Sequence, residues 1–428
     1  MQGVRERVRV AVRGRVRGLR TRNFRLFFVG QLISNSGNWL TMVALTLLVL
    51  HLTGSGVDVG FVAACQFGPI LVLSAFAGLI ADRSNKLRLL KVTQVGEMCQ
   101  SFALAGLAFM HHPPLAALYG TALAGGVLLS LDNPVRRSFV TEMVPQEDVA
   151  NAVTLYSALV NASRIFGPAL AGLLVTTAGY GWAFALDGVS YIAVLTALSL
   201  MRPEELRRMP VTPRGKGQVR AGLRYVRSLP DLWIPFAMLA VVGTLSYNFS
   251  VVFPLFVEHA LHGSDVSFTL VYTVFSSGAL VGAFVVADRT TVGVDNIVRG
   301  AAAFGATSML LAAAPNVIAT FPIVFVVGFS SIVFMTATTA IVQLRADQRM
   351  HGRVLALQSV LLIGTTPIGG PIMGAIADAL GARIPLVIGG AAALAAALFG
   401  LLVGRRVLPQ DACPPEATEP QTVEAAAG

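Results

Sequence analysis

Charged residues are scarce in this chain of 428 residues. They make up 13% of it, against about 25% in an ordinary soluble domain, while 55% of its residues are hydrophobic. A chain of this composition cannot cover itself with side chains that water solvates. The scarcity of charge therefore excludes an ordinary soluble protein.

Cysteine and catalytic motifs are also scarce. The three cysteines, Cys65, Cys99 and Cys413, spell out neither a disulfide framework nor a metal site. The sequence holds no phosphate-binding loop of the form G-x-x-x-x-G-K-[ST] and no H-E-x-x-H zinc motif. These absences argue against an enzyme, and they predict no cofactor and no bound metal.

Long hydrophobic runs are what the chain has instead. A helix needs about 20 apolar residues to cross the hydrocarbon core of a bilayer. Twelve such runs lie near 24–50, 57–81, 88–110, 115–135, 148–176, 182–201, 231–257, 266–287, 295–314, 317–342, 354–379 and 384–404. Helices satisfy their own backbone hydrogen bonds in lipid, and the runs are too long for barrel strands. We therefore predict an all-α membrane protein with twelve transmembrane helices.

The basic residues lie between these runs in a pattern that predicts an orientation. If residue 1 is cytoplasmic, 30 of the 32 Lys and Arg residues fall on the cytoplasmic side, including Arg136 in a turn at 136–137. Only Arg164, inside a span, and Arg383, on the far side, do not. This positive-inside pattern predicts an inner-membrane protein with both termini in the cytoplasm. It also accounts for the net charge of +10 without nucleic acid.

A polar segment divides the spans six and six. We expect a basic cytoplasmic arm (1–22), a six-helix bundle (23–201), a cytoplasmic central loop (202–230), a second six-helix bundle (231–404) and a disordered cytoplasmic tail (405–428). The arm reads either as a basic amphipathic helix on the membrane surface or as a disordered extension. An internal repeat supports the division, because Gly167-Pro168-Ala169-Leu170-Ala171-Gly172 matches Gly370-Pro371-Ile372-Met373-Gly374-Ala375. Two related bundles with a substrate site between them are a transporter architecture.

Two motifs resemble those of a known transporter family. The segment Gly78-Leu79-Ile80-Ala81-Asp82-Arg83-Ser84-Asn85-Lys86-Leu87-Arg88 resembles the loop motif of the major facilitator superfamily, with departures at Asn85 and Leu87. Residues 161–172 resemble the fifth-helix motif of its exporting members, without that motif's earlier glycine. Within the superfamily, the chain is most similar to the branch of the enterobactin exporter and macrolide-efflux-like proteins.

The resemblance implies a function and several residue roles. It implies a monomeric bacterial transporter that exports amphipathic small molecules by alternating access, coupled to protons; a nutrient importer, a lysolipid flippase or a non-transporting secretion or receptor protein are the alternatives. It implies a conformational latch at the cytoplasmic edge formed by Gly78, Asp82, Arg83, Arg88, Asp288 and Arg289, or else an ordinary solvated turn. Gly167, Pro168, Gly172, Gly370, Pro371 and Gly374 would allow close helix packing and bends.

Ionisable residues inside predicted spans are candidates for the coupling mechanism, because a charge at the bilayer centre is unfavourable and normally faces the protein interior. Glu97 lies within the third span and is either a proton-coupling or cation-recognition site or a structural carboxylate. Arg164 needs a partner, for which Glu97 and Asp132 are the plausible choices, and is either a cavity charge or part of a permanent ion pair. Asp132 is a further candidate, or only the i,i+4 partner of Arg136.

A polar stripe on the first span predicts a cavity lining. Gln31, Asn35 and Asn38 recur at i, i+4 and i+7, so one helix face carries amides that lipid would not tolerate. We expect this face to point into a central substrate cavity, with Gln66, Asn161 and Asn248 contributed by other helices. Hydrogen bonding between helices is the alternative use of such residues.

Overall fold

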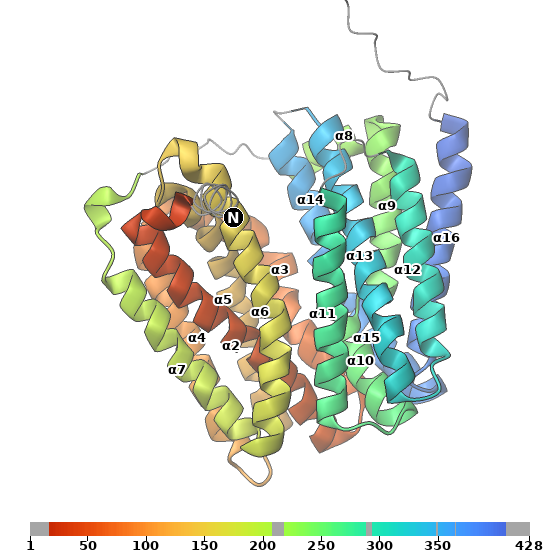
Figure 1. The fold of residues 1–428 in the computed structure, drawn as a ribbon, viewed down its shortest axis with the longest axis horizontal. Helices are drawn as coiled ribbons and strands as arrows, with labels where there is room; N and C mark the ends of the chain where they lie inside the picture. The colour runs from red at the N-terminus through yellow and green to blue at the C-terminus, as the bar shows by residue number, and fades with distance from the viewer. Residues whose placement is uncertain (1–16, 208–217, 288–292, 348–349, 364, 408–428) are drawn as a thin grey trace, which may run out of the picture.

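The computed structural model describes residues 17–207, 218–287, 293–347, 350–363 and 365–407, and within these ranges every regular element is a helix. Figure 1 shows two groups of helices side by side. The first bundle holds α2 (Arg22–Thr53), α3 (Gly56–Arg83), α4 (Lys86–Ala108), α5 (Leu115–Glu142), α6 (Val149–Thr177) and α7 (Tyr180–Ser199). The second bundle holds α9 (Pro230–Leu245), α10 (Phe249–Leu255), α11 (Asp265–Ala287), α12 (Val294–Ala312), α13 (Val317–Arg345), α14 (His351–Ile363), α15 (Thr366–Leu380) and α16 (Ile384–Val407). The all-α prediction is confirmed for the described residues.

Ten helical stretches of the described chain are long and apolar enough to cross a membrane. The predicted spans 88–110 and 295–314 coincide with α4 and α12, which are helical but are not among these ten. In α4 the reason is local, because Lys86, Arg88 and Lys91 occupy its start and Glu97 its middle. The number of twelve transmembrane helices therefore stays a prediction.

The span predicted at 231–257 is broken in the structure. Helix α9 ends at Leu245 and α10 begins at Phe249, and Asn248 is buried at the break between them. A π-helical turn, Phe256–Ala260, follows α10. The backbone groups released by the break are held in part by Asn248, whose side-chain amide donates to the carbonyl oxygen of Thr244 at 2.7 Å.

An unexpected helix, α8 (Gln218–Ser228), lies within the segment 202–230 that the sequence predicts as a loop. Val226 is buried against the second bundle, while the arginines Arg224 and Arg227 belong to the same short helix. The hydroxyl of Tyr225 accepts a hydrogen bond from the backbone N–H of Asp347 at 2.8 Å. This arginine-rich segment thus folds as a helix that packs Tyr225 and Val226 against the second bundle, while Leu223 stays exposed.

Two helix pairs form the most extensive contacts between the bundles, α3 with α15 and α6 with α11. Glycine allows the close approach of both pairs. A Cβ atom at Gly374 of α15 would collide with the carbonyl oxygen of Gly56 in α3, and one at Gly172 of α6 would collide with Thr269 of α11. These contacts need backbone against backbone or against a small side chain, which only glycine permits.

Polar contacts between the bundles lie at one end of the molecule, called here the far end, where α2 finishes and α3 begins. The carboxylate of Asp378 in α15 accepts hydrogen bonds from the backbone N–H groups of Gly56 (2.7 Å) and Val57 (3.0 Å) and from the hydroxyl of Ser55 (3.2 Å). A carboxylate at a helix N-terminus also interacts favourably with the helix dipole. The hydroxyl of Tyr180 donates to Asp265 across the same interface at 2.9 Å.

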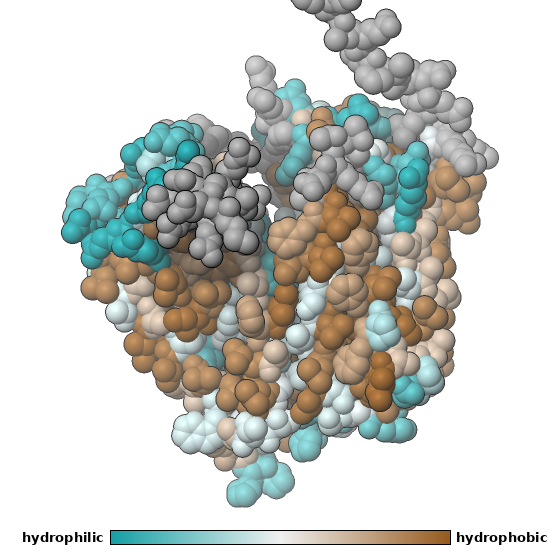
Figure 2. Space-filling model, viewed as in Figure 1, coloured by the Kyte–Doolittle hydropathy of each residue, from teal (hydrophilic) through white to brown (hydrophobic). Residues whose placement is uncertain are grey.

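The opposite end, where α2 begins and α16 finishes, is called here the basic end. Arg17, Arg22, Lys86 and Arg88 lie there, at the starts of the first helices. In Figure 2, hydrophobic residues cover the flanks of both bundles and hydrophilic residues gather at the two ends. The two bundles stand apart at the basic end of that view and meet toward the far end.

The far-end contact of Asp378 generates a prediction. Asp378→Ala removes the acceptor of three hydrogen bonds between the bundles, and a hydrogen bond to a charged group contributes about 1.5–3 kcal/mol. We expect the population closed at the far end to fall. Pulsed electron paramagnetic resonance between spin labels at Met110 and Ala313, in a background without the native cysteines, should show longer distances.

The matched control is Asp58→Ala. Asp58 also lies in the first turn of α3, but its carboxylate accepts a hydrogen bond from Tyr119 within the same bundle, at 2.8 Å. Its replacement should leave the distance distribution unchanged. Identical distributions for the Asp378→Ala variant and the unsubstituted protein would contradict the role given to this contact.

Candidate functional site

Two helices of the first bundle, α4 and α5, bring a cluster of ionisable side chains together. Glu97 comes from the middle of α4, and Asp132 and Arg136 come from successive turns of α5. All three are buried, with 3%, 0% and 3% of their surface exposed, respectively. Side chains of this kind are removed from water only where the protein supplies partners for them.

Arg136 is the centre of the cluster. Its guanidinium forms an ion pair with Asp132, four residues earlier on the same helix. Its Nη1 donates to Oε1 of Gln31 in α2 at 2.7 Å, and its Nη2 lies 3.8 Å from Oε2 of Glu97. One guanidinium therefore contacts side chains from α2, α4 and α5.

Gln94 and Thr93 complete the cluster from α4. The Gln94 amide donates both to Oε2 of Glu97 (2.9 Å) and to Oδ1 of Asp132 (3.1 Å), and the Thr93 hydroxyl donates to Oδ1 of Asp132 at 2.9 Å. Oε1 of Glu97 is buried and has no hydrogen-bond partner among the described residues. Two carboxylates thus share one arginine, and Glu97 is the less well satisfied of the two. Such an arrangement can take up and release one proton.

Asp187 of α7 is a further buried carboxylate of the same bundle, and its partners are hydroxyl groups. It accepts hydrogen bonds from Thr41 (2.6 Å), Ser101 (2.7 Å) and Ser190 (3.3 Å). Its hydroxyl donors come from α2, α4 and α7, so Asp187 ties these helices together. This carboxylate accepts hydrogen bonds from neutral donors and makes no ion pair with the described residues.

The predicted partners of Arg164 are wrong. Its guanidinium lies over the ring of Trp39 in α2, 5.1 Å from the ring centroid, and it pairs with neither Glu97 nor Asp132. The Trp39 ring faces Tyr272 of α11, with 6.5 Å between the centroids, so Arg164 lies where the two bundles meet. The physical reason is the direction of the side chains. Glu97 and Asp132 point into the first bundle, where their charged neighbour is Arg136.

Arg164 also lacks a carboxylate partner anywhere in the described parts of the chain, and its Nε is buried without a hydrogen-bond partner there. It is half-buried in the middle of α6. A guanidinium stacked on an indole ring is stabilised by cation–π attraction, which contributes about 0.5–2 kcal/mol. That leaves its hydrogen-bond donors available to a ligand.

The predicted cavity-lining residues lie in different surroundings. Gln31 is fully buried and contacts Arg136, so in this conformation it lies inside the first bundle instead of lining a cavity between bundles. Asn35, Asn38 and Gln66 are half-buried, and the Nδ2 of Asn35 has no partner among the described residues. The cavity role stays a prediction for these three.

Two other predicted cavity residues bond to their own backbone segments. The amide of Asn161 donates to the carbonyl of Ser157 one turn earlier, at 2.9 Å. Asn248 is buried at the break between α9 and α10, close to Gly369, and its Oδ1 has no partner among the described residues. A cavity role for both also stays a prediction.

The latch motif is only partly visible. Gly78 and Asp82 fall within α3, but the surroundings of both residues lie outside the described part of the chain, as do Asp288 and Arg289 entirely. Arg83 and Arg88 are exposed at the basic end. The start of α4 is capped by Asn85, whose side chain accepts a hydrogen bond from the backbone N–H of Arg88 at 3.1 Å. The latch role therefore stays a prediction.

The glycines of the repeated motif lie at helix contacts. Gly167 packs against Trp39 and the backbone of α2, while Gly370 and Gly374 face Gly60 and Gly56 of α3. Pro168 lies inside the continuous helix α6 and Pro371 inside α15. Close approach thus explains the glycines, and bending at the two prolines stays a prediction.

Sequence reasoning missed Arg136 as a site residue and placed it in a turn at 136–137. In the structure α5 continues to Glu142, whose carboxylate forms an ion pair with Lys86 at 2.6 Å. The i,i+4 spacing from Asp132 was the signal for a buried pair. Gln94 and Asp378 were also missed, and no local pattern marks them.

The described residues contain no group of three or more His, Cys, Asp or Glu side chains that could hold a metal ion. The cluster around Arg136 joins two carboxylates to one guanidinium and to amides.

Known proteins resemble this chain over most of its length. A family model described as transmembrane secretion effector matches residues 14–427. The staphyloferrin A transporter of Staphylococcus aureus is 23% identical over 360 residues, covering 83% of this chain and 89% of that protein. The multidrug efflux pump Tap of Mycolicibacterium fortuitum is 25% identical over 377 residues, covering 83% and 89%. The enterobactin exporter EntS of Escherichia coli O1:K1 / APEC is 24% identical over 388 residues, covering 89% of each.

Solved structures share the fold. A bacterial homolog of the human lysosomal transporter Spinster, in an inward-facing and unoccupied conformation, has a TM-score of 0.71 at 15% identity, covering 90% of this chain and 96% of that one. The POT family transporter PepTSo has a TM-score of 0.74 at 12% identity, covering 91% and 99%. At these identities the likeness extends to the fold alone.

Proposed function

The chain belongs to the transmembrane secretion effector family of the major facilitator superfamily, and on that basis we propose that it exports amphipathic small molecules from the cytoplasm in exchange for protons. It is a secondary transporter, not an enzyme. Its relatives are named as a staphyloferrin A transporter, a multidrug efflux pump and an enterobactin exporter, and two of these names state outward movement. Those names support export as the direction.

The buried cluster in the first bundle is the observation that carries proton coupling. Asp132 holds the ion pair with Arg136, while Glu97 lies 3.8 Å from the same guanidinium and has one oxygen without a partner among the described residues. With both carboxylates ionised the group carries one uncompensated negative charge. A proton on Glu97 removes that charge, so Glu97 is the proton carrier in this proposal.

The contacts between the bundles support alternating access. The hydrogen bonds of Asp378 and Tyr180 join the bundles at the far end. The positive-inside rule favours the basic end as the cytoplasmic one. The structure then corresponds to a conformation open toward the cytoplasm, ready to take up a substrate for export.

Arg164 and its aromatic neighbours are the proposed substrate contact. Trp39 belongs to the first bundle and Tyr272 to the second. The contacts of a molecule bound by both rings would therefore change when the bundles move relative to each other. Arg164 has donors free of any carboxylate in the described chain. We propose that it binds an acidic group of the substrate while the rings contact its apolar part.

Replacing Glu97 by Gln tests proton coupling. The amide keeps the shape and the hydrogen bond from Gln94 but cannot carry the proton. Everted vesicles that contain the Glu97→Gln variant should accumulate a fluorescent amphipathic dye no better than vesicles without the protein when a proton gradient is applied. Exchange of internal for external dye without a gradient should persist, because it needs no net proton movement.

Glu258→Gln, in the π-helical turn of the second bundle, is the matched control and should keep gradient-driven accumulation. Wild-type accumulation by the Glu97→Gln variant, with unchanged pH dependence, would rule out Glu97 as the proton carrier. Gradient-driven uptake into right-side-out vesicles alone would point to an importer.

Replacing Arg164 tests substrate recognition. A hydrogen bond between charged groups contributes about 1.5–3 kcal/mol, which corresponds to roughly tenfold or more in binding. Arg164→Gln should therefore weaken binding of the anionic dye fluorescein to the purified protein by about tenfold relative to the cationic dye rhodamine 6G, measured by fluorescence anisotropy. Arg164→Lys should keep most of the preference for the anion. An unchanged ratio of the two affinities in Arg164→Gln would rule this role out.

A further inference from the structure

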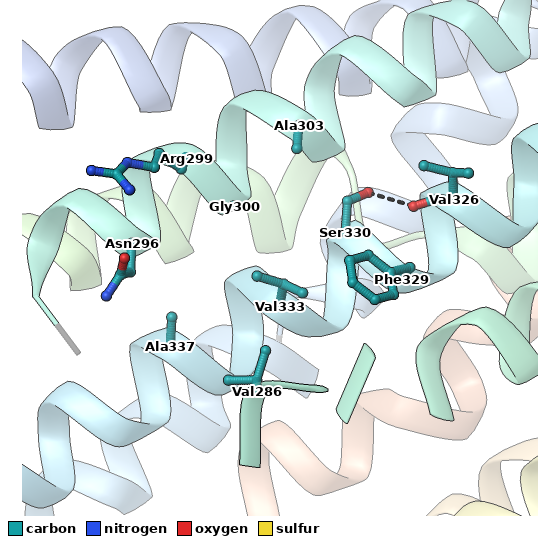
Figure 3. A pocket seen from close by; sticks show the side chains of 10 residues that line it. All are labelled: Val286, Asn296, Arg299, Gly300, Ala303, Val326, Phe329, Ser330, Val333 and Ala337. Carbon is teal, nitrogen blue, oxygen red and sulfur yellow. Dashed lines mark hydrogen bonds between the residues drawn. The ribbon is translucent and has the colours of Figure 1, made fainter. Parts of the chain in front are cut away.

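A groove of about 260 Å³ runs along the outer side of the second bundle, between α11, α12 and α13. Figure 3 shows its lining: Val286 from α11, Gly300 and Ala303 from α12, and Phe329 and Val333 from α13 among others. Helix α13 contacts both neighbours, so it forms the floor of the groove. The groove is separate from the cluster around Arg136 and from the contact of Arg164 with Trp39.

Small residues produce the groove. Gly300 of α12 packs against the backbone of Phe334 in α13, where an added Cβ would lie only 3.0 Å from the Phe334 Cα. The helices are therefore close on their inner sides. On the outer side, Ala303 and Ala337 present only a methyl group each, which leaves a trough between them.

The lining of the groove is suited to an apolar ligand. The one hydroxyl in its lining, Ser330, donates to the carbonyl oxygen of Val326 one turn earlier at 2.8 Å, as the dashed line in Figure 3 shows. It is thereby satisfied within its own helix. Val326 in the groove and Leu310 nearby on α12 are 45% and 57% exposed, as expected for a face toward lipid. Water gains few hydrogen bonds in such a space, whereas an acyl chain fills it favourably.

A positive charge marks one end of the groove. Arg299 lies near the start of α12, at the basic end, and Figure 3 shows its guanidinium extending beside Asn296 at the mouth. Arg299 is exposed and makes no ion pair with the described residues, including Asp295 one turn earlier. A guanidinium matches the geometry of a phosphate group with two parallel hydrogen bonds. The inner leaflet, which the basic end would face, carries anionic lipids.

We propose that this groove binds one anionic phospholipid, with an acyl chain along α13 and the phosphate on Arg299. The apolar trough and Arg299, which has no ion-pair partner among the described residues, lie next to each other on a face whose apolar side chains are exposed. The site is independent of the substrate contact and of the proton cluster. A lipid there would hold α11, α12 and α13 together during movement of the bundles.

Native mass spectrometry of the purified full chain tests the site. Phosphatidylglycerol and phosphatidylethanolamine with identical acyl chains are added separately, and the bound lipids are counted. The unsubstituted protein should retain one more phosphatidylglycerol than phosphatidylethanolamine, and Arg299→Gln should lose that preference. Arg88→Gln, which removes an exposed arginine at the same end of the first bundle, is the matched control and should keep it.

A second variant separates tail from headgroup. Ala303→Phe fills the groove without changing any charge, so it should release the retained phosphatidylglycerol while Arg299 is still present. Arg299→Lys should retain it in part. The proposal is overturned if Arg299→Gln keeps the same lipid preference as Arg88→Gln, or if Ala303→Phe retains the lipid in full. The readout is binding alone, so it stands apart from whether the protein couples export to protons.

Discussion

A charge that enters the hydrocarbon region must find its partner inside the protein, and the first bundle is arranged around that requirement. The guanidinium of Arg136 contacts Asp132 and Gln31 and faces Glu97, so α2, α4 and α5 are tied at one buried point. Removing one partner from a buried ion pair is destabilising by about 3–5 kcal/mol, because the other charge is left uncompensated. The gain or loss of one proton at this point therefore changes the stability of the whole arrangement.

The second bundle is held together differently. Phe249 packs against Tyr247, Phe253, Phe275 and Phe304, with ring centroids 4.5–6.0 Å apart. Aromatic packing of this kind requires no counter-ion and does not respond to protons. In the proposed cycle, the first bundle carries the proton-linked change, and the second supplies an apolar wall for the substrate.

The fold was more predictable from sequence than the site. A long apolar run is stable in lipid only as a helix, so most helices lie where those runs predict them, although the run at 231–257 is broken between α9 and α10. Arg136 was misplaced because its apolar run ends near residue 135, although α5 continues to Glu142. Counting basic residues on each side assigns every arginine beyond a run to the aqueous edge, and it takes no account of a carboxylate one turn away. Asp132 is that carboxylate, but the prediction followed the end of the apolar run and not the i,i+4 spacing.

Contacts between distant segments were beyond sequence reasoning. Which way Arg164 faces depends on the rotation of α6 about its axis, and that rotation is set by packing against α2 and α11. Asp378 carries no local signal, because the N–H groups it accepts from belong to residues more than 300 positions earlier in the chain. Glycines such as Gly374 were predictable as packing positions, since close approach is what glycine offers.

In the proposed mechanism, two buried carboxylates share one arginine and Glu97 carries the exchangeable proton. Infrared difference spectroscopy of the purified protein, recorded as the pH is raised, reports that proton through the carbonyl stretch of a protonated carboxylic acid. We expect a band that disappears on raising the pH, is missing in Glu97→Gln and is kept in Asp187→Asn. A spectrum in which Glu97→Gln leaves that band unchanged would rule out Glu97 as the proton carrier.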